Sequence, residues 1–190
     1  MSEARDLTAG AGKVDWDLLK ADLMGLPKET LAELVNVWLK TYWSLQNYWM
    51  VFTEAESGFA TVGKLDAQVW EKVAPIQAHR VKKALGLGDD VQALATVLKF
   101  TAPQWAPAGF DWELDEVGET ELRMTVHSCP MGNYRKERNL ELLPCKYGAP
   151  ALYSALAKVV NEKFETTCLH AHPDPPQKGV MCSWEFVLKD

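Results

Sequence analysis

The sequence has no apolar run long enough to cross a membrane, because no window approaches the ~18 uninterrupted apolar residues of a spanning helix. Its first 13 residues, MSEARDLTAGAGK, also lack the apolar stretch of a signal peptide. Acidic residues outnumber basic ones by 26 to 20, which gives a net charge of −6, and no basic helix or stripe occurs. We therefore expect a cytoplasmic protein that binds neither nucleic acid nor an anionic membrane. Its partner is then a small molecule or another protein.

The length of the chain fits one domain. With 190 residues and 47% hydrophobic content, it can bury about 70% of its unfolded surface in a single core. We expect a flexible tail at residues 1–13 and one α+β domain at 14–190. That domain divides into a helical half, 14–102, and a half rich in cysteine and histidine, 108–190.

Apolar residues recur every three or four positions in the first half, which predicts helices over 15–24, 28–57, 65–85 and 89–100. The third is expected to kink at Pro75. The helix at 28–57 is apolar on more than one face, because Trp43, Tyr48 and Met50 widen its stripe. Core packing explains such a helix, and a ligand or a second subunit is the alternative, which leaves a homo-oligomer open.

The pattern changes to alternation after Pro103, Pro107 and Gly109. Residues 110–114 and 122–126 predict a β-hairpin, and 165–172 and 180–188 predict two further strands. A charged loop is expected at 133–141 and a helix after Pro150. We therefore predict an α+β fold with the helical N-terminal half packed on a mostly antiparallel four-stranded sheet.

Four cysteines, Cys129, Cys145, Cys168 and Cys182, are separated by 15, 22 and 13 residues, without the short C-x2-C spacing of common zinc modules. Three interpretations stay open: buried apolar thiols, a catalytic thiol, or a zinc or iron site formed by the four cysteines and His170. Strand alternation places His170 on one face with Cys168.

The catalytic interpretation favours Cys145 as a nucleophile. This residue precedes a predicted helix, whose dipole stabilises a thiolate, and Lys146 adds a positive charge. His127 is the candidate base, and alternation puts it on one face with Cys129, the second candidate catalytic thiol.

Arg135 and Arg138 lie between two of these cysteines and can clamp a substrate carboxylate through their guanidinium groups. A solvated loop is the alternative for this stretch. Trp184 is a candidate wall of the substrate pocket, although large aromatic side chains more often fill a core.

Several short motifs resemble the bacterial L-2-amino-thiazoline-4-carboxylic acid hydrolase-like proteins. They are Trp70, Ala78-His79-Arg80, Lys82, Leu85-Gly86-Leu87, Cys129-Pro130, Cys145, Pro173-Asp174-x-Pro176 and Cys182-Ser183-Trp184-Glu185-Phe186. The resemblance covers about 31–188 and implies hydrolysis of a C=N bond in a small sulfur heterocycle. Widely spaced cysteines beside many tryptophans are also similar to vinyl-reductase-like ligand-sensing domains, which implies a zinc ion beside an apolar pocket.

Two functions are therefore expected from the sequence. The first is a hydrolase acting on a C=N or C–N bond of a small cyclic substrate that bears a carboxylate, like a thiazoline carboxylate. The second is a non-catalytic small-molecule-binding or sensor domain with a Cys/His metal site beside an aromatic pocket.

Overall fold

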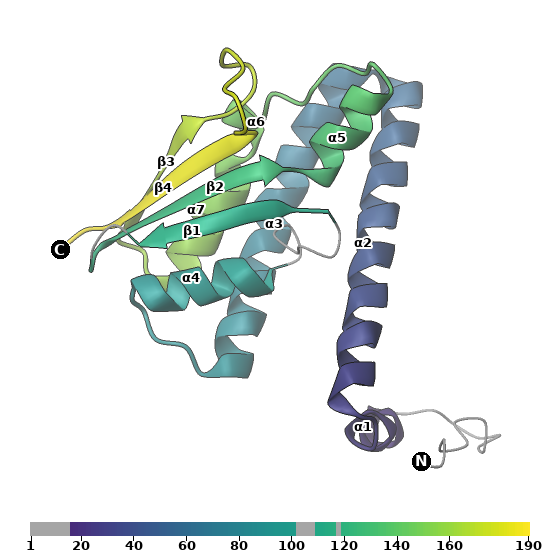
Figure 1. Ribbon diagram of the computed structural model, residues 1–190, viewed down its shortest axis with the longest axis vertical. Helices are drawn as coiled ribbons and strands as arrows, with labels where there is room; N and C mark the ends of the chain where they lie inside the picture. Colours follow the sequence, from purple (N-terminus) through teal and green to yellow (C-terminus); the bar gives the residue numbers. More distant parts are fainter. Residues whose placement is uncertain (1–15, 102–108, 117–118) are drawn as a thin grey trace. The chain divides into compact units, whose positions relative to one another are not determined.

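The computed structural model describes residues 16–101, 109–116 and 119–190 (Figure 1). The chain divides into two compact units, the first ending at Trp38 and the second beginning at Leu39. The first unit contains α1 (Trp16–Met24) and the start of α2 (Lys28–Ser57), and the second contains everything from Leu39 onward. The predicted tail at 1–13 lies outside the described residues.

The helices α2 to α4 match the predicted first half, except that α3 and α4 begin at other residues. α2 ends at Ser57, as predicted, and Gly58 follows with a positive φ of 81°. α3 (Phe59–Leu85) begins six residues earlier than predicted and runs through Pro75 as one helix. α4 (Val91–Phe100) begins two residues later than predicted, because Asp90 is its N-cap and the Asp90 carboxylate accepts a hydrogen bond from the Ala93 amide at 2.8 Å.

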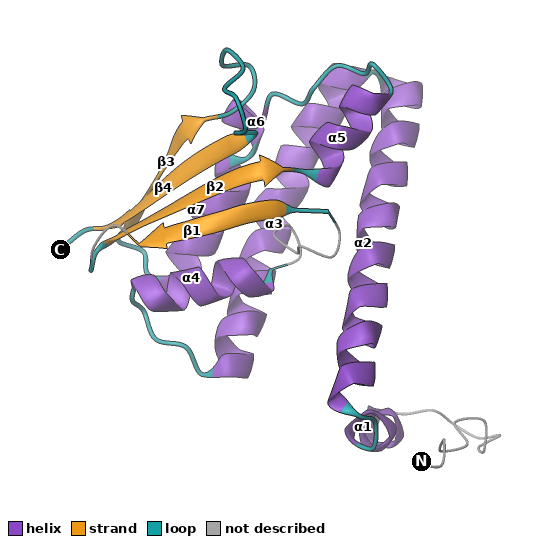
Figure 2. Cartoon of the chain, in the orientation of Figure 1, coloured by secondary structure: helices purple, strands orange, loops and turns teal. Residues whose placement is uncertain are grey.

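The second unit contains a four-stranded antiparallel sheet with the strand order β1-β2-β4-β3 (Figure 2). Its strands are β1 (Asp111–Glu116), β2 (Glu121–Ser128), β3 (Phe164–His170) and β4 (Cys182–Leu188). Leu122, Met124 and Val126 of β2 are buried, and the residues between them are partly exposed. One face of the sheet therefore belongs to the core. The predicted α+β fold is confirmed.

Helices cover the apolar face of this sheet. α7 (Pro150–Val160) packs against β3, α3 packs against α7, and α4 contacts β2 (Figure 1). One continuous core of side chains from α3, α4, α7 and the sheet joins these elements, and Trp43 of α2 completes it.

The segment after β2 differs from the prediction. A helix, α5 (Pro130–Glu137), stands where the charged loop was expected from 133 onward, and a single turn, α6 (Cys145–Gly148), precedes α7. Pro130 suits the first turn of α5, and Asn133 donates a hydrogen bond to the Ser128 hydroxyl at 2.7 Å. The helix lacks an apolar stripe because a buried arginine, Arg135, anchors it instead, so periodicity does not reveal it.

Both late strands are shorter than predicted. β3 ends at His170, where the Asp174 carboxylate accepts a hydrogen bond from the Ala171 amide at 3.2 Å and turns the chain. β4 begins at Cys182 instead of residue 180. Within the described ranges, no helix has the length and apolar content that crossing a bilayer requires.

Candidate functional site

Three of the four cysteines meet around one apolar cavity of about 100 Å³ in the second unit. Cys129 precedes the first turn of α5, Cys145 opens α6 and Cys182 opens β4, so three elements deliver them. Aromatic and aliphatic side chains form most of the wall. The lining residues are Trp43, Gln46, Asp66, Trp70, Phe110, Cys129, Met131, Leu143, Cys145, Ala149, Leu152, Tyr153 and Cys182.

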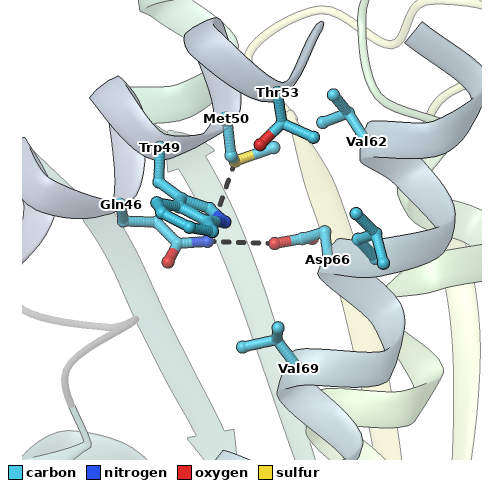
Figure 3. A pocket seen from close by; sticks show the side chains of 8 residues that line it. Gln46, Trp49, Met50, Thr53, Val62, Asp66 and Val69 are labelled. Carbon is cyan, nitrogen blue, oxygen red and sulfur yellow. Dashed lines mark hydrogen bonds between the residues drawn. The ribbon is translucent and has the colours of Figure 1, made fainter. Parts of the chain in front are cut away.

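The carboxyl group in this lining belongs to Asp66 of α3, a residue that the sequence analysis missed. Gln46 of α2 donates a hydrogen bond to Asp66 Oδ1 at 3.0 Å, as Figure 3 shows, and the Trp70 indole donates to the same oxygen at 3.1 Å. Across the described part of the chain, no hydrogen bond reaches the second oxygen, Oδ2. Asp66 therefore has an acceptor to offer a ligand.

A sequence signal for Asp66 does exist. Val62, Trp70, Ala74 and Ala78 are buried and share one column of α3 at spacings of four residues. Asp66 occupies the position in that column between Val62 and Trp70. A charged residue inside a buried helical stripe is rare without a partner, so its presence marks a candidate site.

Burial controls the ionisation of Asp66. It raises the pKa of the carboxyl from 3.8 to about 6, although the hydrogen bonds from Trp70 and Gln46 act in the opposite direction. The same carboxylate contributes to the raised pKa of Tyr42, after burial of that phenol. Asp66 thus changes protonation close to neutral pH, which ordinary aspartates do not.

Two further cavities reach Asp66. One of about 290 Å³ shares Asp66, Leu143 and Cys145 with the first and is also lined by Lys64. The other, of about 110 Å³, lies between α2 and α3, with Gln46, Trp49 and Met50 on one side and Val62 and Val69 on the other (Figure 3). The carboxyl therefore lies at the junction of three hollows.

The thiols around the cavity are protonated. Burial raises the pKa of Cys145 to about 12, and burial also raises the pKa values of Cys129 and Cys182. The expectation of a Cys145 thiolate is wrong, because α6 is a single turn and Lys146 forms an ion pair with Asp174. After burial, the neighbouring acidic groups Cys129 and Asp66 raise the pKa of Cys145 further.

We expect iodoacetamide to modify Cys145 in the native protein about 10³-fold more slowly than an ordinary thiol at a pH near 8, since thiolate content falls with rising pKa. The thiol of Cys168, on β3, should react first because it is the least enclosed of the four. Mass spectrometry of time points checks this order, with urea-unfolded protein as the reference. Rapid and selective labelling of Cys145 would contradict it.

His127 does not lie with the thiols. Its ring Nδ1 donates to the Gly179 carbonyl at 2.7 Å, and Nε2 lies 3.2 Å from Glu113 Oε1. The Gly179 carbonyl and Glu113 together raise the pKa of His127. The ring follows Val126 onto the open face of the sheet, whereas Cys129 packs into the core beyond the strand end. The predicted shared face, and with it the pairing of His127 as base with Cys145, is wrong.

Arg135, one of the two arginines predicted to bind a substrate carboxylate, binds a carboxylate of the protein itself. Arg135 is 2% exposed, and its Nη1 and Nη2 lie 2.7 and 3.0 Å from the two carboxylate oxygens of Glu54. Arg138 stands at the surface over the Tyr134 ring, 3.9 Å from its centroid. Trp184 is fully buried against Tyr153, with ring centroids 4.6 Å apart. These three residues therefore do not line the cavity at Asp66.

The predicted zinc or iron site stays a prediction. Among the residues that the structure describes, no group of three or more His, Cys, Asp or Glu side chains has an arrangement that could hold a metal ion. The strand alternation that was predicted to place Cys168 and His170 on one face is interrupted, because the register shifts between them. Cys168 lies opposite Trp184, and His170 lies opposite Ser183. His170 Nδ1 lies 4.0 Å from Asp174 instead.

Comparison with known proteins identifies the family of this chain. No curated protein and no solved structure matches it. The model of a family of unknown function, DUF6125, matches residues 24–188. That range includes the whole lining of the cavity at Asp66, and the chain belongs to the DUF6125 family.

Proposed function

We propose that this protein binds a small, mostly apolar molecule that carries a basic or hydrogen-bond-donating group, with that group at Asp66. The observation that carries the proposal is a carboxyl with a pKa of about 6 inside a cavity walled by aromatic side chains. Apolar walls with a few convergent polar groups are the usual composition of small-molecule sites.

The walls and dimensions support an apolar ligand. The three thiols of the lining are protonated and behave as small apolar groups. An apolar cavity of about 150 Å³ holds one benzene molecule. A ring-sized ligand would therefore extend from the 100 Å³ cavity into the adjoining 290 Å³ cavity.

Charge supports a basic group on that ligand. A carboxylate without a cation is costly in an apolar cavity, and an ammonium or amidinium group removes that cost while it donates hydrogen bonds. No lysine or arginine is found among the described residues that line the 100 Å³ cavity. A ligand cation would thus supply the charge that the lining of this cavity lacks, since Lys64 lines only the adjoining 290 Å³ cavity.

Benzylamine should bind at least about tenfold more tightly than toluene or benzoate, because only the amine can pair with Asp66. Isothermal titration and tryptophan fluorescence measure the three affinities. Binding of the amine should weaken as the pH falls below about 6, where Asp66 takes up a proton. Asp66→Asn should lose the preference for the amine.

The matched control is Glu71→Gln, an acid-to-amide change on the exposed side of the same helix, with the Glu71 side chain 62% exposed. It should retain the full preference for benzylamine. Equal affinity for all three compounds in the unmodified protein would refute a role for Asp66 in ligand binding.

A second candidate function is hydrolysis of a C=N bond in a small cyclic ligand, as the thiazoline resemblance implies. Two observations favour it: the pKa of Asp66 suits a general base acting on water, and Lys64 beside Cys145 can meet a ligand carboxylate. Incubation with 2-amino-thiazoline-4-carboxylate and assay of released thiol tests it. Absence of thiol release alongside benzylamine binding would leave the binding function alone.

A further inference from the structure

An exposed apolar face covers α2 and α3 on the second unit. Four large side chains of α2 are between 63% and 68% exposed, and three of α3 are between 40% and 47% exposed. The two rows lie side by side, since Trp49, Leu65 and Val69 line the same hollow. The residues of this α2–α3 apolar face are Leu45, Tyr48, Trp49, Phe52, Leu65, Val69 and Ile76.

The spacing of the α2 row is that of a helix that pairs with another helix. Tyr42 and Trp49 are seven residues apart, and Leu45 and Phe52 are seven residues apart, so the pairs occupy the two apolar positions of a heptad. Between Leu39 and Ser57 the inward side of α2 buries Trp43 and Met50. Of the four heptad residues, Leu45, Trp49 and Phe52 are between 65% and 68% exposed, whereas Tyr42 is half-buried and packs against the core.

The area of this face approaches that of a stable interface. Phe, Tyr and Trp side chains each bury about 150–250 Å², so the three aromatic rings of the face offer on the order of 300–500 Å². The four aliphatic side chains add to this. A specific interface covers about 800 Å² per partner, and contiguous apolar patches beyond a few hundred Å² mark interaction sites.

Charge identifies a second copy of this chain as the occupant. The heptad flanks of α2 are Thr41, Gln46, Tyr48 and Thr53, and none is charged. Two identical helices can therefore meet without like-charge repulsion, although each chain has a net charge of −6. An anionic membrane would require lysines or arginines at these flanks.

We propose that two copies of this protein pair through the α2–α3 apolar face in a two-fold symmetric dimer. The same patch then serves both partners, as the commonest oligomers require. On α3, Lys72 is three residues after Val69 and four before Ile76, so it shares the side of the helix that carries this row and, paired with Glu71, adds a polar contact to the interface. This dimer does not depend on the proposed ligand site.

Sedimentation velocity and light scattering on the full chain test the dimer. The unmodified protein should have twice the chain mass of 21.3 kDa, and Leu45→Glu/Phe52→Glu should have the monomer mass with unchanged helical circular dichroism. Neither residue lines a cavity at Asp66, so benzylamine binding should survive. Ser44→Glu, on an exposed side of α2 outside the face, should remain a dimer.

If the two glutamates unfold the protein, the milder Leu45→Ala/Phe52→Ala variant should still raise the dimer dissociation constant by at least about tenfold. A monomeric unmodified protein at micromolar concentration would overturn the proposal. So would a dimer that the alanine and glutamate variants leave intact, or a monomer that binds neutral phosphatidylcholine vesicles through this face.

Discussion

Glu54→Gln should lower the free energy of unfolding by about 3 kcal/mol, because it leaves the buried Arg135 guanidinium without its countercharge. Arg135 is 2% exposed, donates through Nε to the Glu141 carbonyl and lies over the Phe59 ring, 5.0 Å from its centroid. These contacts hold the charge in place after Glu54 is neutralised. Urea unfolding followed by circular dichroism measures the loss.

The matched control is Glu185→Gln at the Arg123–Glu185 pair, an arginine–carboxylate contact made through one nitrogen, with Arg123 Nη2 3.1 Å from Glu185 Oε1. Its side chains are 43% and 28% exposed, so the loss should stay below about 1 kcal/mol. Equal losses in the two variants would show that Arg135 does not need Glu54. The Arg135 contact also lowers the pKa of Glu54, so its contribution should fade as acid protonates that carboxylate.

Asp66→Asn, in contrast to Glu54→Gln, should raise the free energy of unfolding, by up to ~3 kcal/mol at a pH near 7. The folded state raises the pKa of Asp66 from 3.8 to about 6, and one pKa unit corresponds to about 1.4 kcal/mol. The folded state therefore binds the proton more tightly than the unfolded state does. Below about pH 4, Asp66 is protonated in both states and does not change the free energy of unfolding. As the pH rises to about 6, ionisation of Asp66 increasingly favours the unfolded state.

Unfolding curves of the two proteins from about pH 4 to pH 7 test this pH dependence. The stability difference should start near zero and increase with pH, whereas Glu71→Gln should show little difference throughout. A variant that is less stable than the unmodified protein at neutral pH would show that the ionised Asp66 carboxyl does not destabilise the fold. Functional sites often contain groups that lower the stability of the folded protein because binding needs them. A carboxyl that destabilises the fold is typical of such a site.

Local patterns predicted most of the fold. The spacing of Leu45, Trp49 and Phe52 marked α2, and the alternation of Leu122, Met124 and Val126 marked β2. Both patterns show which side of an element is apolar. α5 has no apolar side of this kind, because its buried residue is Arg135. That arginine is paired with Glu54, which lies 81 positions earlier in the chain.

The candidate site was harder to predict because it depends on the environment of each group. The cysteines around the cavity stand out in the sequence, but burial opposes the thiolate predicted for Cys145. The prediction that His127 lies with Cys129 was wrong, since strand alternation cannot show that the chain turns into α5 after Ser128. Asp66 was missed because its importance comes from Gln46 and Trp70 and from the cavity around them.

A carbon NMR titration of the Asp66 side chain, with and without benzylamine, tests whether this carboxyl binds the cationic group of a ligand. In the free protein the carboxyl should titrate with a midpoint of about 6. Bound benzylamine should move that midpoint down, because its ammonium group stabilises the carboxylate. A midpoint of about 3.9, the ordinary value for aspartate, that benzylamine leaves unchanged would rule out Asp66 as the ligand-binding carboxyl.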